Sequence, residues 1–477
     1  MRIIRKLSAL ILLLVLAMAG TALAQDKTVL LQSKNWDPIV KQTLNDAMTR
    51  FGKTASDYDP SIRPYAVFDF DNTVAILDVE EQLAIYQLEN LAFAIPADKM
   101  YDVLTTGIPN PDAELGGDYG KHTVASVARD AAEAYKKLCA KGWVKVDNYK
   151  DQKNRPWLKS SDWQEFATKA RWLYSAIGDS MDVSVSYPWI TYWFTGMTPA
   201  QVHDMAYTAF VDYDQKSKAK DFWKKLSWTS PKDYPGAKAG QLTVSFNQGV
   251  TVSPELLELF AALEANGIDA WICSASFTDV ITAAVKAFNI PGVNGVVAMT
   301  NKKVNGVYAN EYDYDFHAQT QGPGKAESLD KLVRPLYRNA GPMLVAFDSQ
   351  GDFNFCTVYK DTAVGLGLNR ARKDDAGLLA AIAVYQNKKN ITLEESLKAG
   401  DTRSAGQKRK RRLPLGKARN PGPWQGQARS LELQGRRLAQ DARKRHDSQA
   451  ASRSGTQSDR QAQDLRGLQD PLGLPLL

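Results

Sequence analysis

The segment YAVFDFDNT, residues 65–73, joins an apolar run directly to two carboxylates. The run from Tyr65 to Phe70 predicts a buried strand, and Asp69 and Asp71 stand where that strand should end. In open α/β sheets, ligands bind at the carboxyl ends of the strands. One Asp at such a position can act as a nucleophile, and the other can transfer a proton. An ordinary polar turn explains the same pentapeptide, so the rest of the chain decides between the two.

Further apolar runs indicate more strands of the same sheet. They cover residues 268–273, 343–347 and 363–367, with a weaker one at 295–299. Helical patterns lie between them, and one helix is bounded clearly by Ser253-Pro254 at its start and Gly267 at its end, because Ser, Pro and Gly favour those positions. Strands that alternate with helices predict an α/β fold with a parallel sheet.

A long segment separates the first predicted strand from the second. A crossover between parallel strands needs only about a dozen residues, so residues 81–249 predict an inserted domain. Helical patterns at 124–138 and 160–177 indicate that this domain is mostly helical.

The N-terminus has the pattern of a secretory signal peptide over residues 1–24. Basic residues precede an apolar stretch that ends in the small-x-small sequence Ala22-Leu23-Ala24. A retained membrane anchor is the alternative, but the apolar stretch is short for a span of about 20 residues. We expect a periplasmic or secreted protein without a stable membrane anchor after cleavage.

The formal net charge of +7 comes mainly from the two ends of the chain. Residues 404–477 are basic, open with the run Lys408–Arg412, and contain little that could form a core. This composition predicts a disordered tail. A nucleic-acid-binding arm, a solvated extension and an out-of-frame translation of the gene end are alternative interpretations, and we expect no nucleic-acid partner. The three cysteines and four histidines lack metal-site spacing, so a zinc site is not expected.

Three more sites follow predicted strands or precede a predicted helix. Ser274 follows the strand at 268–273, and Lys325 follows Gly322-Pro323-Gly324 at a helix start. Asp348 and Asp352 follow the strand at 343–347. A hydroxyl, a lysine and two acids can respectively donate to a phosphoryl oxygen, neutralise a phosphate and bind a hard cation. Taken alone, each is more often a helix cap, a surface residue or a solvated loop, respectively.

The order of these motifs resembles that of the haloacid dehalogenase superfamily of aspartate-nucleophile phosphatases. The resemblance covers about 65–80 and 250–370, and implies a Rossmann-like core with a central first strand. Residues 25–80 and 250–403 would form this core, and residues 81–249 would be a type I cap. Phe347 departs from the family pattern, in which Gly commonly precedes the acid.

The resemblance implies roles for the motif residues. Asp69 would be the nucleophile that forms an aspartyl-phosphate, and Asp71 the general acid and then the base. The residues implied in phosphate binding are Asn72, Thr73, Ser274 and Lys325.

The resemblance also implies a magnesium site. Mg²⁺ would be held by Asp69, Asp348 and the backbone carbonyl of Asp71, with Asp352 orienting its waters or Lys325. The acid at position 71 distinguishes the phosphatases of the superfamily from its dehalogenases. The predicted activity is therefore an Mg²⁺-dependent phosphomonoesterase acting on a small phosphate ester.

A looser resemblance to exported bacterial phosphatases of the phosphorylcholine phosphatase type suggests the substrate. Aromatic faces bind quaternary ammonium groups, and Trp189, Tyr192 and Trp193 cluster in the predicted cap. Acids after the first motif, including Glu80 and Glu81, could add negative potential. The same aromatic residues would also suit a hydrophobic core. The alternatives are a broad-specificity periplasmic acid phosphatase and a non-catalytic exported binding protein. The sequence leaves the oligomeric state open.

Overall fold

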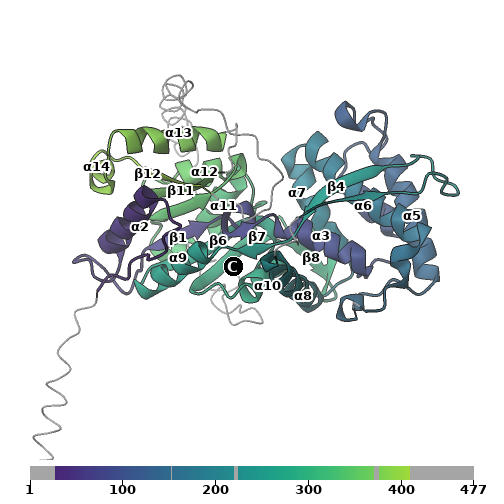
Figure 1. The fold of residues 1–477 in the computed structure, drawn as a ribbon, viewed down its shortest axis with the longest axis horizontal. Helices are drawn as coiled ribbons and strands as arrows, with labels where there is room; N and C mark the ends of the chain where they lie inside the picture. The colour runs from purple at the N-terminus through teal and green to yellow at the C-terminus, as the bar shows by residue number, and fades with distance from the viewer. Residues whose placement is uncertain (1–26, 152, 220–223, 370–374, 409–477) are drawn as a thin grey trace, which may run out of the picture.

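The computed structural model describes residues 27–151, 153–219, 224–369 and 375–408 (Figure 1). The predicted signal segment 1–24 and the greater part of the predicted tail, 409–477, lie outside the described residues. Among the helices that are described, none is both long and apolar enough to span a membrane.

The fold is α/β, and its centre is a six-stranded parallel sheet in the order β12-β11-β10-β1-β6-β7. All five predicted strands are present, and β1 lies inside the sheet between β10 and β6, which confirms the predicted fold class. The strands are β1 (Tyr65–Phe68), β6 (Asp269–Phe277), β7 (Val293–Met299), β10 (Leu344–Phe347), β11 (Val364–Asn369) and β12 (Arg403–Lys408).

Side chains of the central strand alternate between the two faces of the sheet, as a strand period of two requires. Ala66 and Phe68 enter the largest hydrophobic cluster, whereas Tyr65 and Val67 enter another on the opposite face. Both faces are covered by helices, so an apolar run without polar interruptions is what a buried parallel strand needs. One face carries α2 (Pro38–Phe51), α9 (Pro254–Ala265), α10 (Thr278–Ala287) and α14 (Leu393–Lys398); the other carries α11 (Pro323–Leu332), α12 (Phe353–Thr357) and α13 (Asp375–Lys388).

The predicted start of the tail at residue 404 is wrong. Residues 403–408 form the edge strand β12, which pairs in parallel with β11 along its whole length. Ala405 is buried in the largest hydrophobic cluster. Composition indicated a tail here because the basic run begins at Lys408, but the five residues before it are small or polar and suit an edge strand covered by α13 and α14.

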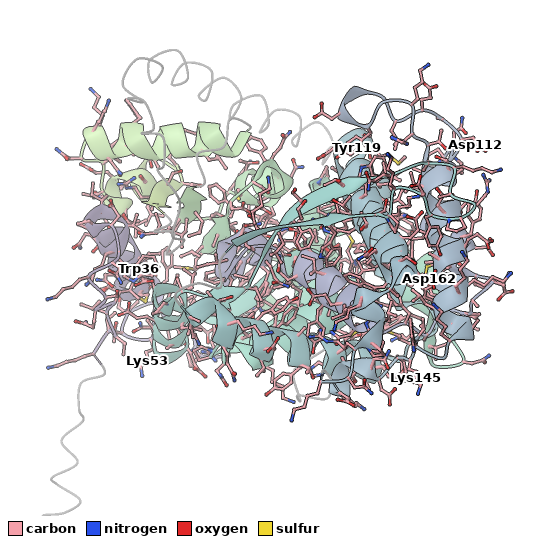
Figure 2. All side chains as sticks on the ribbon, turned by 45° about the vertical axis from the view of Figure 1, so that its right-hand side comes forward. Trp36, Lys53, Asp112, Tyr119, Lys145 and Asp162 are labelled. Carbon is pink, nitrogen blue, oxygen red and sulfur yellow. The ribbon has the colours of Figure 1, made fainter. Side chains whose placement is uncertain are left out.

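The inserted segment, residues 81–249, folds mainly into helices beside the sheet (Figure 1). A second hydrophobic cluster gathers residues from position 84 to position 244. Figure 2 shows Asp112, Tyr119, Lys145 and Asp162 on this part and Trp36 and Lys53 at the opposite end. Its elements are α3 (Val79–Asn90), α4 (Met100–Thr105), α5 (Val124–Ala140), α6 (Ser161–Ser180), α7 (Val183–Thr191), α8 (Pro199–Lys218), β3 (Lys224–Thr229) and β4 (Thr243–Gln248).

Two features join the inserted segment to the sheet. Helix α8 packs along α10, where the Phe210 and Phe288 rings stack at 5.8 Å, and its buried residues belong to the same cluster as the sheet. The hairpin of β8 (Asn301–Val304) and β9 (Val307–Tyr312) exchanges backbone hydrogen bonds with Gly196 and Met197 through Tyr308, each 2.8 Å long. The short strands β2 (Ala75–Ile76) and β5 (Thr251–Val252) pair with each other where the chain passes between the sheet and the inserted segment.

Candidate active site

The two acids of the first motif lie just beyond β1. The strand ends at Phe68, two residues earlier than predicted, and the backbone N–H of Asp69 donates to Ala346 of β10 at 3.0 Å. The following turn needs a left-handed residue, which Asn72 supplies with φ of 61°; Asn is among the few non-glycine residues that adopt this conformation readily. The turn places Asp69 and Asp71 at the carboxyl end of the sheet.

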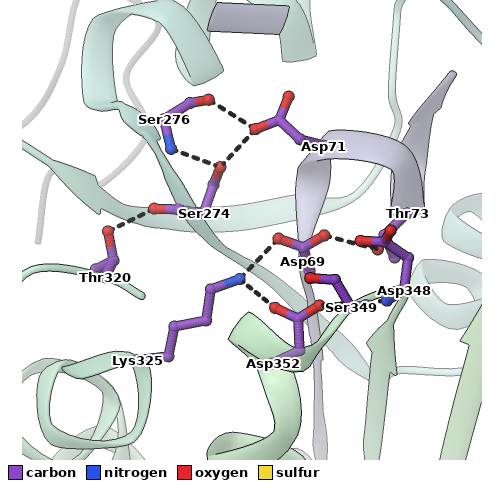
Figure 3. Close-up of polar contacts among 10 residues, drawn as sticks. All are labelled: Asp69, Asp71, Thr73, Ser274, Ser276, Thr320, Lys325, Asp348, Ser349 and Asp352. Carbon is purple, nitrogen blue, oxygen red and sulfur yellow. Dashed lines mark hydrogen bonds and ion pairs between the residues drawn. The ribbon is translucent and has the colours of Figure 1, made fainter. Parts of the chain in front are cut away.

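Lys325 connects two of the predicted motifs (Figure 3). Its Nζ lies 2.7 Å from Asp69 Oδ1 and 2.6 Å from Asp352 Oδ1, and all three side chains are buried. The other oxygen of Asp352 accepts the backbone N–H groups of Asp348 and Ser349 at 3.2 and 3.3 Å. The first turn of α11 and the loop after β10 thus position one ammonium against two carboxylates.

Burial dominates the electrostatics of this group. It raises the pKa of Asp69, an effect that Lys325 opposes. It likewise raises the pKa of Asp352 to about 6, with repulsion from Asp69 adding to it. Burial would by itself lower the pKa of Lys325, but Asp352 and Asp69 raise it well above its ordinary value. The lysine is therefore charged, and the carboxylates around it outnumber it.

The predicted phosphate ligand Thr73 has a different partner in the structure. Its hydroxyl donates to Asp69 Oδ2 at 2.6 Å and lies 3.5 Å from Asp348 Oδ1. Thr73 is fully buried, so this hydroxyl orients the Asp69 carboxylate. Lys325, which also binds Asp69, stays a predicted phosphate ligand on this side.

Asp71 faces away from Lys325, toward the end of β6. Its Oδ2 accepts the Ser276 hydroxyl at 2.6 Å and lies 3.3 Å from the Ser274 hydroxyl (Figure 3). Its Oδ1 accepts the backbone N–H of Val79, the first residue of α3, at 2.6 Å. Burial raises the pKa of Asp71 well above its usual range, and Asp78 and Asp69 add to this. A carboxyl whose pKa is raised in this way suits a general acid.

Three of the predicted metal ligands converge. Ligand oxygens of Asp69, Asp348 and Asp352 lie within 4.8 Å of one another. Oxygen donors of this kind are those preferred by Mg²⁺, and an excess of buried carboxylates over ammonium groups is what a divalent cation would offset. The donor set therefore fits the predicted ion. The Asp71 carboxylate is turned toward the serines and does not belong to this cluster.

The acids that follow the first motif lie against the same site. Asp78 caps α3, and the Glu80 carboxylate accepts the backbone N–H of Phe277 at 2.9 Å, immediately after Ser276. Burial raises the pKa of Glu80 to about 8, and its Oε1 has no hydrogen-bond partner among the described residues. Glu81 forms an ion pair with Arg171 of α6.

Trp189, Tyr192 and Trp193, which we predicted to contact the substrate, pack in the hydrophobic core of the inserted segment, and their contact with a substrate stays a prediction. Trp189 and Trp193 are each 1% exposed in the second hydrophobic cluster, and the Trp189 indole donates to the Leu104 carbonyl. Tyr192 is buried in the same cluster. The aromatic pattern came from helix packing, because an inserted helical segment needs large side chains to fill its own core.

Two other tyrosines interact electrostatically with the acids of the site. Tyr187, which is 39% exposed, has its pKa raised to about 12 by burial of its hydroxyl and then by Asp78 and the Asp352–Asp69 pair. Burial, followed by Asp78 and Glu81, raises the pKa of Tyr174 well above its usual value. Sequence patterns did not distinguish these two from the other aromatic residues. Ser276 was also missed, although it lies in the same Ser-Ala-Ser segment as Ser274.

Comparison with known proteins supports the fold. No family model and no curated protein matches the chain. A conserved protein of unknown function from Anaerococcus prevotii DSM 20548 is similar in structure, with a TM-score of 0.64 and 24% identity over 79% of this chain and 96% of that one.

Two other solved structures are much less similar. A protein of unknown function from Bordetella pertussis Tohama I has a TM-score of 0.28 and 11% identity over 58% of this chain and 76% of that one. A HAD family hydrolase from Salmonella enterica subsp. enterica serovar Typhi has a TM-score of 0.26 and 10% identity over 64% and 56%. Only the similarity to the Anaerococcus protein supports the fold, and the chemistry rests on the residues of the site.

Proposed function

We propose that this chain is a phosphomonoesterase of the haloacid dehalogenase superfamily, dependent on Mg²⁺ and acting through an aspartyl-phosphate. One observation carries the proposal. Five motif residues from four separate segments converge at the carboxyl end of the sheet: Asp69 and Asp71 in different environments, Ser274 beside Asp71, and Lys325 bound to both Asp69 and Asp352. Two carboxylates whose surroundings give them different tasks are typical of a nucleophile and an acid–base pair.

In the proposed reaction, a carboxylate oxygen of Asp69 attacks the phosphorus atom. The bond from phosphorus to the ester oxygen breaks, and the Asp71 carboxyl gives its proton to that oxygen, so the alcohol leaves neutral. Water then attacks phosphorus, Asp71 takes the water's proton, and the bond between Asp69 and phosphorus breaks. Lys325 and Ser274 hold the phosphoryl oxygens, which is the positioning and charge neutralisation that phosphoryl transfer needs.

Asp69, Asp348 and Asp352 are the side chains that would hold Mg²⁺. When bound, the ion supplies the positive charge that lets an anionic carboxylate approach an anionic phosphate. The Lys325 ammonium, 2.7 Å from Asp69 Oδ1, supplies further positive charge.

The proposed substrate is a small phosphate ester with a cationic alcohol, of which phosphorylcholine is the leading candidate. Among the acids at the start of α3, Asp78 supports a cation beside the site, whereas Glu80 has a raised pKa and Glu81 pairs with Arg171. The partly exposed Tyr187 offers an aromatic face near the same acids, and such faces attract quaternary ammonium groups. A periplasmic or secreted location belongs to the same proposal.

The test is a panel of phosphate esters assayed with Mg²⁺ and with EDTA. We expect turnover that needs Mg²⁺, a preference for phosphorylcholine, and no activity in the Asp69→Asn variant. Turnover by Asp69→Asn would exclude the assigned nucleophile. Ligand binding without turnover of any ester would indicate that the chain is a non-catalytic binding protein.

A broad-specificity phosphatase is the second candidate. It is favoured by the burial of Trp189 and Trp193, because these side chains, which suggested choline recognition, pack in the core of the inserted segment. Similar kcat/KM values for phosphorylcholine, glycerol phosphate and nucleotides would support it. A Tyr187→Ala variant that loses activity selectively toward phosphorylcholine would exclude it.

A further inference from the structure

The segment that contains Ser274 presents two hydroxyls to the site, and they have different partners. Ser276 Oγ lies 2.6 Å from Asp71 Oδ2, a short distance typical of a strong bond to a carboxylate. Ser274 Oγ lies 3.3 Å from the same oxygen and accepts the backbone N–H of Ser276 at 3.1 Å. The stronger contact to the acid–base residue is therefore made by Ser276.

Ser276 is held firmly in this position. It is 3% exposed, its own N–H is bound by Ser274, and the next N–H, that of Phe277, is bound by Glu80. Its hydroxyl can therefore restrict the rotation of the Asp71 side chain. The backbone N–H of Val79 binds the other oxygen of Asp71 from α3, so the carboxyl is held from two sides.

We propose that Ser276 is a positioning residue that fixes the orientation of the Asp71 carboxyl for proton transfer to the leaving alcohol, while Ser274 serves the phosphoryl group. This inference rests on the phosphomonoesterase proposed above. The step concerned is the first one, in which the bond from phosphorus to the ester oxygen breaks and the Asp71 proton moves to that oxygen.

The inference makes the effect of Ser276 depend on the leaving group. An alkoxide is a poor leaving group and needs the proton of Asp71, whereas p-nitrophenolate is a stable anion that departs with little help. Positioned proton transfer contributes about 10²–10⁴-fold, and misplacement of a catalytic group by about 1 Å can cost about 10²-fold. A loss of orientation should therefore appear mainly with alkyl esters.

The experiment compares kcat/KM of the Ser276→Ala variant for an alkyl ester, phosphorylcholine or glycerol phosphate, with that for p-nitrophenyl phosphate, both with Mg²⁺. The value of kcat/KM reports only the steps up to phosphoryl transfer to Asp69, so the later attack of water does not affect it. We expect a fall of about 10- to 100-fold for the alkyl ester and of about threefold or less for the aryl ester.

Ser274→Ala is the matched control, because a phosphate-binding hydroxyl should affect both esters equally. In an Asp71→Asn background, Ser276→Ala should have no further effect on the selectivity between the esters. Ser276→Thr, which keeps the hydroxyl, should restore much of the alkyl-ester activity. Ser276→Cys retains the side-chain volume with a weaker donor, and serves if the alanine variant does not fold.

Equal losses for both esters in Ser276→Ala would overturn the inference and make Ser276 a phosphate ligand or a purely structural residue. Unchanged kcat/KM for both would equally overturn it. Absence of turnover by the unsubstituted protein with either ester would instead refute the proposed function, so the two failures are distinguishable.

Discussion

Lys325 is the residue whose loss should disturb the site most. Its side chain is 2% exposed, and its ammonium is bonded to Asp69 and Asp352. Removal of one partner from a buried ion pair leaves an uncompensated charge. We expect Lys325→Met to lower the free energy of unfolding by about 3–5 kcal/mol, measured by urea denaturation in EDTA. Because the remaining carboxylates repel each other, adding Asp352→Asn to this variant should recover part of the loss. Equal stability of the single variant and the unsubstituted protein would contradict this account.

Glu80 should make stability depend on pH. Burial raises its pKa from 4.5 to about 8 in the folded protein, so the folded chain keeps a proton that the unfolded chain loses above about pH 4.5. The contribution of Glu80 to the free energy of unfolding should therefore be fully present below that pH and be lost as the pH rises through 8. At about 1.4 kcal/mol per pKa unit, the loss amounts to a few kcal/mol.

The matched variant for this prediction is Glu80→Gln, which has no titrating proton. Thermal unfolding of both proteins in EDTA between about pH 5 and pH 9 should show the unsubstituted protein losing stability relative to the variant. A stability difference that stays constant over this range would mean that Glu80 ionises normally. The comparison separates Glu80 from the other acids because both proteins share them.

Among the structural elements, the β8–β9 hairpin holds the inserted segment beside the sheet. Asn301 is fully buried, donates to the Thr191 carbonyl at 3.1 Å, and lies 3.1 Å from the Thr191 hydroxyl. Asn301→Ala would leave the Thr191 carbonyl buried without this donor, and we expect a loss of about 1–3 kcal/mol in the free energy of unfolding. Asn310→Ala is the control, because Asn310 bonds Thr106 at 2.8 Å from a partly exposed position on the same hairpin. Equal losses of unfolding free energy from the two variants in urea denaturation would show that burial of the Asn301–Thr191 pair adds no stability.

The strands were predictable from sequence because buried parallel strands are short apolar runs with polar ends. The same holds for Asp69, Lys325 and Asp348, which follow strands or open a helix, and for Ser274, which lies near the end of β6. The hydrogen-bond partners of these residues were not predictable. Sequence order does not show that Thr73 turns toward Asp69, or that Ser276 approaches Asp71 more closely than Ser274 does. Such details depend on turn geometry and on rotamers fixed by packing.

The molecule as a whole is a sheet with an inserted helical segment that shares its core. Phe194 and Phe210 of the inserted segment belong to the hydrophobic cluster of the sheet. The insertion could be predicted from the number of residues that separate the first two strands of the sheet along the sequence. Its docking could not, because an amphipathic pattern shows which face of a helix is apolar but not what covers it. For the same reason, the tryptophans that suggested a ligand site proved to be core residues.

The edge strand β12 extends the folded chain beyond the boundary that composition indicates. It contributes more than its six backbone pairs with β11. Ala405 is buried, and the Gln407 side chain accepts the backbone N–H of Asp37, just before α2, at 2.8 Å and reaches the Asn35 carbonyl at 3.2 Å. The strand therefore ties the start of α2 to the sheet.

A chain that ends at Arg403 should consequently be less stable than one that ends at Lys408. The shorter chain exposes the edge of β11 and loses both Gln407 bonds, and a typical intramolecular hydrogen bond contributes about 0.5–1.5 kcal/mol. We expect a lower thermal midpoint for the chain ending at Arg403, together with faster proteolysis near α2. Gln407→Ala in the longer chain separates the contributions, because it removes the two side-chain bonds and keeps the strand pairing. If the two truncated chains unfold at the same temperature, β12 adds no stability. Residues 404–408 would then lie in the sheet without contributing to the free energy of unfolding.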